Sequence, residues 1–158
     1  VGLVNGVIEV FKPIAGSKSI SLKLDSAVES VHVTVDIEMI KSVVRNLISN
    51  AIKFSHKDTA VVVHVRVQEV ADENRTEAGN DKEVLVTVSD SGCGIKKEDQ
   101  EKLLNEATHF TTFGTDSEEG SGLGLLLCKD FVSKNHGRLW FTSEEGVGSN
   151  FNFTIPLK

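Results

Sequence analysis

Apolar and polar residues follow two different periods along the chain, and each period predicts one kind of element. Apolar residues recur at every third or fourth position in residues 4–15 and 37–54, which is typical of helices that bury one face. Two further helices are expected at residues 96–104 and 123–135. Strands are expected where the two kinds of residue alternate, at residues 20–24, 31–35, 61–70, 83–89, 138–143 and 150–156. Together these elements predict an α+β two-layer sandwich with helices on one face of a mixed sheet.

Turn-forming and polar residues mark the connections between these elements. Asp36 stands directly before the longest expected helix, where its carboxylate would cap the first backbone N–H groups. Residues 71–82 are polar and contain a glycine, so they are expected to link two strands. Residues 105–120 show no clear periodicity and are expected to form a long loop. The length of 158 residues fits one domain, which we take as residues 1–158.

Composition narrows the class of protein. A hydrophobic content of 39% with 25% charged residues is that of a globular domain, and the net charge of −6 argues against non-specific binding to nucleic acid. No apolar run is long enough to cross a bilayer, and the amino terminus has no signal-peptide pattern. A membrane-anchored parent stays compatible with both observations. Cys93 and Cys128 form neither a metal-ligand spacing nor a disulfide framework, so a reducing, cytoplasmic setting is expected.

Three polar residues share one face of the helix expected at residues 37–54. Asn46, Asn50 and Lys53 are four and three residues apart, which places them beside one another next to the apolar face. Asparagine lowers helix propensity, so two of them in mid-helix favour a binding role. An amide oxygen can bind Mg²⁺ beside a triphosphate without adding charge, and a lysine can meet the phosphates. The alternative is an ordinary solvent-exposed helix face.

A second polar motif follows the strand expected at residues 83–89. Asp90 is an acceptor only, so it suits the exocyclic amine of adenine and would repel the carbonyl oxygen of guanine. Gly92 and Gly94 leave room for a flat base and the backbone to approach each other closely. The alternative is a plain strand-to-helix turn.

A third motif is the run of glycines at residues 120–125, immediately before an expected helix. Its N–H groups and the positive end of the helix dipole could bind phosphate oxygens. The motif is weak by itself. It also lies late in the chain and follows a loop, whereas the dinucleotide-binding fingerprint opens the first strand–helix unit.

Taken together, these motifs resemble those of sensor histidine kinases. Residues 45–55 (RNLISNAIKFS) look like the N box of that family. Residues 90–94 and 120–125 resemble its two glycine boxes, with Ser121 where threonine is commoner, and residues 110–115 (FTTFGT) fall in the position of the F box and ATP lid. Residues 146–149 (GVGS) match the glycine turn near the end of the family's domain. Residues 105–125, with the Leu-Cys-Lys that follows at residues 127–129, are most similar to hybrid two-component sensors of gut Bacteroidetes.

The resemblance implies the Bergerat ATP-binding fold, with a mostly antiparallel sheet, and the cofactors ATP and Mg²⁺. It implies Asn50 as the metal ligand and Asn46, Asn50 and Lys53 as the catalytic residues. The nucleotide-binding residues that it implies are Asn46, Asn50, Lys53, Phe54, Asp90, Gly92, Gly94, Ile95, Thr115, Gly120, Ser121, Gly122, Leu123 and Gly124.

Asn46 separates the branches of this superfamily. The related ATPases carry a water-activating glutamate four residues before the Mg²⁺ asparagine, and a neutral amide cannot act as a general base. The sequence therefore favours a kinase that passes the γ-phosphoryl group to a histidine on a separate helical hairpin. Positioning and electrostatics, which this domain would supply, are most of what phosphoryl transfer needs.

The expected partners follow from the same resemblance. They are the kinase's own phospho-acceptor hairpin, of which no His-Glu or His-Asp pair appears before residue 4, and a downstream response regulator or receiver domain. We expect the cytoplasmic part of an inner-membrane, homodimeric sensor, and an isolated domain that is monomeric and does not autophosphorylate. The alternatives are a self-sufficient ATPase of the gyrase or chaperone type, a serine kinase of the anti-sigma-factor type, and a degenerate module that binds no nucleotide.

Overall fold

The computed structural model describes residues 1–75, 79, 81–103 and 124–157. Its helices are α1 (Gly2–Ser17), α2 (Ile37–Phe54), α3 (Lys97–Leu103) and α4 (Gly124–Lys134), with a short 3₁₀ turn at Asp72–Asn74. Its strands are β1 (Ser21–Ser26), β2 (Ala60–Glu69), β3 (Lys82–Asp90), β4 (Leu139–Glu144) and β5 (Gly148–Pro156). Most elements lie where the sequence predicts them.

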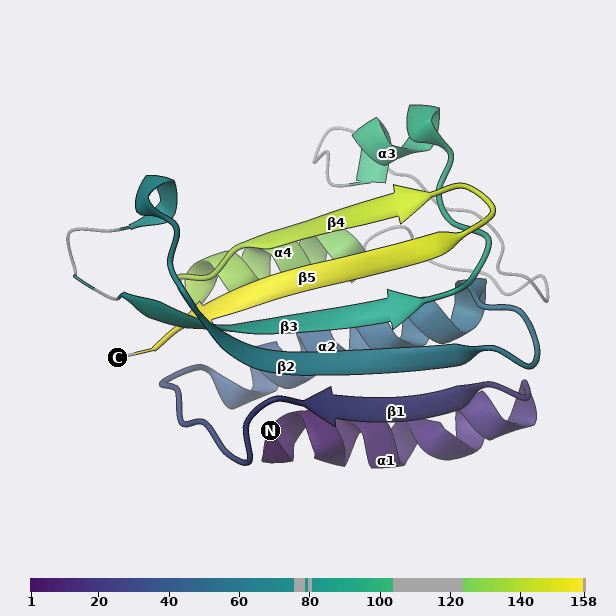
Figure 1. Ribbon diagram of the computed structural model, residues 1–158, viewed down its shortest axis with the longest axis horizontal. Coiled ribbons are helices and arrows are strands. Elements are labelled where there is room, and N and C mark those ends of the chain that lie inside the picture. Colours follow the sequence, from purple (N-terminus) through teal and green to yellow (C-terminus); the bar gives the residue numbers. More distant parts are fainter. Residues whose placement is uncertain (76–78, 80, 104–123, 158) are drawn as a thin grey trace.

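The strands form one sheet in the order β1-β2-β3-β5-β4. The β1–β2 pair is parallel, and the other three pairs are antiparallel. Figure 1 shows α1, α2 and α4 side by side on one face of this sheet, while α3 lies outside the β4 edge of the sheet. The predicted α+β two-layer sandwich with a mixed, mostly antiparallel sheet is therefore confirmed.

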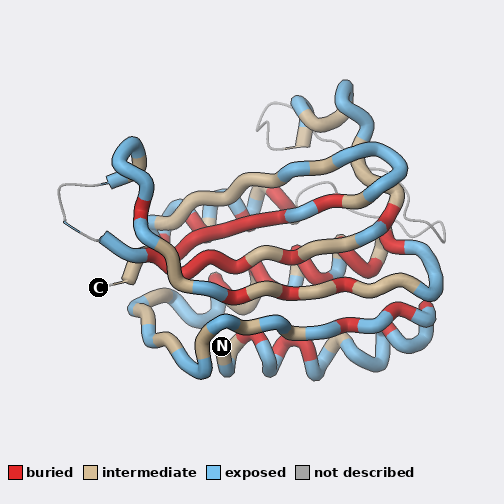
Figure 2. The backbone as a smooth tube through the Cα atoms, viewed as in Figure 1, coloured by how far each residue is buried: buried red, intermediate tan, exposed pale blue. Residues whose placement is uncertain are grey.

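The core lies between the sheet and the three helices, and α2 runs through its centre. Val43, Val44 and Ile48 of α2 are completely buried, as are Val63 of β2 and Phe153 of β5. Figure 2 shows many buried positions along β3 and β5 in the middle of the sheet and along the helices behind it, whereas α3 has none. The burial of this apolar face, at about 25 cal/mol per Å², is what holds α2 against the sheet.

The start of α2 is built as the sequence predicts. The Asp36 side chain accepts a hydrogen bond from the Met39 backbone N–H at 3.0 Å, which caps the helix. Asn135, which follows α4, accepts a hydrogen bond from the Asp36 backbone N–H at 2.8 Å. The helix that carries Asn46 and Asn50 is thus tied at its first residue to the end of α4.

The prediction of a strand at residues 31–35 is wrong. No strand is assigned there, although burial alternates as predicted. Val31, Val33 and Val35 are partly buried against the core, whereas His32 and Thr34 are exposed. An extended segment can turn alternate side chains toward a core without pairing with a neighbouring strand. The alternation therefore reported which side chains face the core, and not backbone hydrogen bonding.

The end of α1 also differs from expectation. Helix α1 continues through Pro13 to Ser17, and the sequence pattern predicts its end at residue 15. A proline removes one backbone donor, but Phe11 before it and Ala15 after it still pack on the core. The loop expected at residues 105–120 lies outside the described residues.

Candidate nucleotide-binding site

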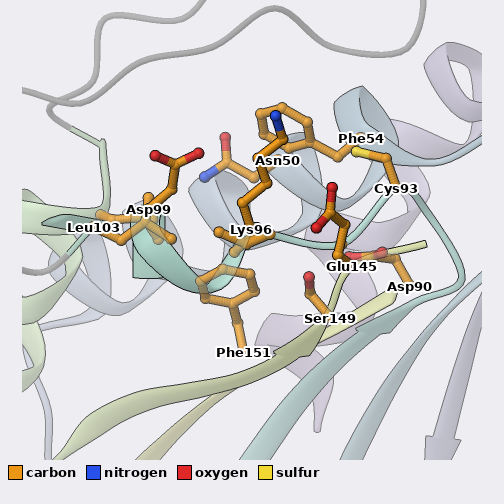
Figure 3. A pocket seen from close by; sticks show the side chains of 13 residues that line it. Asn50, Phe54, Asp90, Cys93, Lys96, Asp99, Leu103, Glu145, Ser149 and Phe151 are labelled. Atoms are coloured by element: carbon orange, nitrogen blue, oxygen red, sulfur yellow. The ribbon is translucent and has the colours of Figure 1, made fainter. Parts of the chain in front are cut away.

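One cavity of about 280 Å³ lies between α2, the loop after β3, α3 and the β4–β5 turn (Figure 3). Five of the residues predicted from the sequence line it: Asn50, Phe54, Asp90, Gly94 and Ile95. The remaining lining residues are Cys93, Lys96, Asp99, Leu103, Leu125, Glu145, Ser149 and Phe151. The structure thus brings Asn50 of α2 and Asp90, forty residues apart in sequence, to the same cavity. We call residues 90–95 the aspartate loop.

Asp90 is the last residue of β3 and lies opposite Ser149 of β5 in the sheet register. Burial raises the pKa of its carboxyl group, and hydrogen bonds from the backbone N–H groups of Gly92 and Ser149 oppose that rise. The hydrogen bond from Gly92 is 2.9 Å long. These contacts fix the orientation of a largely buried carboxylate. Because a carboxylate only accepts hydrogen bonds, this end of the cavity suits a ligand that donates one.

The glycines of the aspartate loop are required by close backbone contacts. A Cβ atom at Gly92 would lie 2.1 Å from the Phe54 carbonyl oxygen at the end of α2. Gly94 has a φ of +66°, and a Cβ atom there would lie 2.1 Å from the Glu144 carbonyl oxygen. Between them, the Cys93 N–H donates to the Phe54 oxygen at 3.1 Å. The loop is therefore held between α2 and the β4–β5 turn.

A hydrogen-bond network outside the cavity fixes Ile95, the next residue of the loop. The Ile95 N–H donates to the Ser143 hydroxyl at 2.8 Å, and the Gln100 amide donates to the Ile95 carbonyl at 2.9 Å. Gln100 also donates to the Ser143 carbonyl at 3.1 Å, and the hydroxyl groups of Ser143 and Ser149 are 2.7 Å apart. Both backbone groups of a lining residue are thus satisfied by residues that do not line the cavity.

The last turn of α2 is held by a lysine that the sequence analysis missed. Lys18 is only 7% exposed, and its ammonium donates to the carbonyl oxygens of Ile52 at 3.1 Å and Lys53 at 2.9 Å. The Ser55 hydroxyl donates to the Ala51 oxygen at 2.6 Å. Carbonyls at a helix C-terminus have no partners within the helix and carry its negative dipole end, so an ammonium group is well placed there.

The predicted face of α2 divides between two surroundings. Asn50 lines the cavity, whereas Asn46, one turn earlier, lies beside Gly124, the first residue of α4; a Cβ atom on that glycine would be 3.3 Å from the Asn46 amide oxygen. Burial raises the pKa of the Cys128 thiol to about 12, against the lowering effect of a hydrogen bond with Asn46. The Lys53 ammonium lies 5.0 Å from the centre of the Phe54 ring and does not line the cavity.

Magnesium would find few protein ligands in this part of the chain. Within residues 1–75, 79, 81–103 and 124–157, no group of three His, Cys, Asp or Glu residues is placed to hold a metal ion. The Asn50 amide oxygen is the protein donor that the cavity offers on α2. Mg²⁺ commonly takes one or two protein oxygens and draws the rest from water and substrate phosphates, so this donor set fits Mg²⁺ only together with a nucleotide.

Several predicted residues lie outside the described residues, namely Thr115, Gly120, Ser121, Gly122 and Leu123. Gly124, the last of the predicted nucleotide-binding residues, lies within the described part and begins α4. The role of these six residues at the phosphates stays a prediction.

Five of the lining residues that sequence reasoning missed were signalled by periodicity. Lys96, Asp99 and Leu103 are three and four residues apart, which is the spacing of one helix face. Ser149 and Phe151 are two apart on β5, on the row of that strand that faces the helices. Extending the core-facing pattern of β5 back toward the glycine turn would have found Ser149.

The model of the family described as "Histidine kinase-, DNA gyrase B-, and HSP90-like ATPase" matches residues 35–158. The chain therefore belongs to this family. It is 34% identical, over 99% of its length, to the adaptive-response sensory kinase SasA of Synechococcus sp. (strain JA-2-3B'a(2-13)), of which it covers 38%. It is also 34% identical, over 99% of its length, to the sensor protein EvgS of Escherichia coli (strain K12), of which it covers 12%. The chain thus spans well under half of these relatives.

Solved structures give the same result for the fold. The nucleotide-free catalytic domain of the histidine kinase ThkA superposes with a TM-score of 0.72 and 26% identity, covering 98% of this chain and 90% of that one. Full-length ShkA in complex with AMPPNP has a TM-score of 0.75 at 22% identity, covering 98% of this chain and 29% of ShkA. The fold is that of histidine kinase catalytic domains. In the described part of the chain, no helix is both long enough and apolar enough to cross a membrane.

Proposed function

We propose that this chain is the ATP-binding catalytic domain of a two-component sensor kinase. In this proposal it binds ATP with Mg²⁺ and donates the γ-phosphoryl group to a histidine on a separate helical hairpin. The observation that carries the proposal is the cavity that the largely buried carboxylate of Asp90 and the amide of Asn50 both line. The family and the sensor kinases among its relatives support it.

Asp90 would recognise the base. Its carboxylate would accept a hydrogen bond from the exocyclic amine of adenine, and it would repel the carbonyl oxygen that guanine carries at the same position. Phe54, Ile95, Leu125 and Phe151 give the cavity apolar surfaces that suit a flat aromatic ring. Because Gly92 and Gly94 allow the loop to touch α2 and the β4–β5 turn, this surface needs little rearrangement when a base enters.

The phosphates would extend from the base toward α2. Asn50 would hold Mg²⁺, which neutralises phosphate charge when it is bound, and Asn46 and Lys53 would assist at the phosphates. Gly120, Ser121, Gly122 and Gly124 would offer backbone N–H groups. Asn46 supports a transferase in particular, because an amide has no proton-accepting group with which to activate water.

The proposed partners are the kinase's own phospho-acceptor hairpin and a response regulator or receiver domain. The hairpin would belong to a longer protein of which this chain is a part, since SasA and EvgS are each much longer than this chain. The response regulator or receiver domain would act downstream of it. We propose a cytoplasmic location for this domain within a membrane-anchored homodimer, with the isolated domain monomeric.

A transfer assay tests this proposal. The chain is incubated with Mg²⁺ and γ-labelled ATP, with and without the hairpin of the full-length protein prepared separately. We expect label on the hairpin only when both parts are present, and we expect it to be labile in acid and stable in base, as phosphohistidine is. A hairpin with its acceptor histidine replaced by glutamine is the control. Steady ATP turnover by the chain alone, or an acid-stable label on serine, would contradict the proposal.

A further inference from the structure

The charge of the cavity does not suit the phosphates of the proposed ligand. Among the described lining residues, Asp90, Asp99 and Glu145 are acidic, and Lys96 alone is a lysine or arginine. A nucleoside triphosphate carries several negative charges, which these carboxylates repel. Its phosphate chain therefore needs a cationic group at the end of the cavity away from the acidic side chains.

Lys53, the lysine predicted for this role, does not line the described cavity, and its ammonium lies over the Phe54 ring. Lys96 stands at the junction of the aspartate loop and α3, on the side of α3 that also carries Asp99 and Leu103. In Figure 3 its side chain crosses the cavity from that junction, and its nitrogen points toward the α2 side, where Asn50 and Phe54 lie.

The ammonium of Lys96 is available to a ligand. Among the residues that the structure describes, Lys96 makes no ion pair, and its side chain donates no hydrogen bond. The carboxylate three residues along, Asp99, is paired with Lys102 at 3.8 Å. Lys96 is thus a charged side chain that lines a cavity without a protein partner among these residues.

We propose that Lys96 binds the phosphate chain of the nucleotide, next to the metal position at Asn50. The inference rests on the proposed function, because it takes a nucleotide as the ligand. An ammonium on a flexible stem acts as a point charge for phosphate, so its contribution grows with the charge of the ligand and is screened by salt. The Lys96 ammonium adds no affinity for an uncharged nucleoside.

The test compares the charge-neutralising variant Lys96→Gln with Lys97→Gln. Lys97 is the adjacent residue, is also exposed, and does not line the cavity. Dissociation constants for adenosine, ADP and AMPPNP with Mg²⁺ are measured by calorimetry for wild type and both variants. For Lys96→Gln we expect about three- to tenfold weaker binding of ADP and AMPPNP, the size of a partly exposed charge contact, and adenosine affinity within about twofold.

The Lys97→Gln variant should bind all three ligands as the wild type does, and Lys96→Arg should restore ADP affinity. Raising the salt concentration should weaken ADP binding more in the wild type than in Lys96→Gln. Equal losses for adenosine and ADP, or no loss for either, would overturn the assignment of Lys96 to the phosphates. Failure of the wild type to bind any of the ligands would instead contradict the proposed nucleotide site itself.

Discussion

The two ends of the cavity are built in different ways. At the end proposed for the base, which we call the base end, Asp90, Gly92 and Gly94 belong to a loop whose backbone touches α2 on one side and the β4–β5 turn on the other. At the end proposed for the phosphates, which we call the phosphate end, the lining groups are the side chains of Asn50 and Lys96, which project from a helix and from a loop end.

This difference predicts that substitutions at the two ends affect stability and nucleotide affinity differently. Changes to Gly92 or Gly94 disturb backbone contacts that also hold the fold together, so they should lower both stability and nucleotide affinity. Changes at the phosphate end remove side chains that the described fold does not need, so they should lower affinity alone. The predictions below run from the largest expected effect on binding to the smallest.

Gly94→Ala should abolish nucleotide binding and lower the free energy of unfolding by about 2–4 kcal/mol. The alanine Cβ would collide with the Glu144 carbonyl, and the φ of +66° is itself unfavourable for a side chain. Urea unfolding measures the stability. The matched control is Gly146→Ala, where φ is +79° but no atom lies within 4 Å, so only the conformational cost of about 1–2 kcal/mol applies. Equal losses in the two variants would contradict the close packing of the loop.

Asp90→Asn should weaken adenosine binding by about 10- to 100-fold, the size of a lost hydrogen bond to a charged acceptor. It should not lower the stability of the unliganded protein, because an asparagine oxygen can still accept from Gly92 and Ser149. Calorimetry and urea unfolding measure the two effects. A destabilised variant with unchanged adenosine affinity would contradict the assignment of Asp90 to the base.

The same aspartate gives a pH dependence with a definite sign. Burial raises its pKa above the ordinary value of 3.8, so the folded protein binds the proton more tightly than the unfolded chain. Its contribution to stability therefore falls as pH rises from 3.8 through the raised pKa. Adenosine affinity should show the opposite trend, because protonation removes an acceptor. Both trends should be absent in Asp90→Asn.

Asn50→Ala should weaken binding of AMPPNP with Mg²⁺ about tenfold and leave adenosine affinity unchanged. The expected reason is the loss of the protein oxygen next to the metal. The free energy of unfolding should stay within about 0.5 kcal/mol of wild type, because the Asn50 side chain makes no hydrogen bond with another residue in the described part of the chain. An equal loss of adenosine affinity would place Asn50 at the base instead.

Lys18→Met should lower the free energy of unfolding by about 1–2 kcal/mol and weaken all adenine ligands by only about threefold. The variant leaves two carbonyls at the end of α2 without their ammonium partner, so Phe54 and Asn50 are held less firmly. Lys12→Met is the control, because Lys12 is exposed and paired only with Glu9 on the same helix. Identical behaviour of the two variants would show that Lys18 does not position α2.

The sequence could predict the base end because it is encoded locally. Asp90, Gly92 and Gly94 are close neighbours after a strand, and α2 has both a cap and a clear apolar period. Lys18 could not be predicted, because a single lysine before a strand carries no sign of the helix end that it meets. Ser143 likewise acts through a contact with Ile95 across 48 residues, which no local pattern contains. The error at residues 31–35 has the same origin, since pairing partners lie elsewhere in the chain.

Adenine selectivity at Asp90 is the centre of this account, and competitive calorimetry tests it most directly. ADP and GDP, each with Mg²⁺, are titrated into the wild-type chain under identical conditions. The account predicts saturable binding of ADP and at least about tenfold weaker binding of GDP, because the carboxylate repels the guanine carbonyl. Equal affinity for ADP and GDP, or no binding of ADP at millimolar concentration, would contradict it.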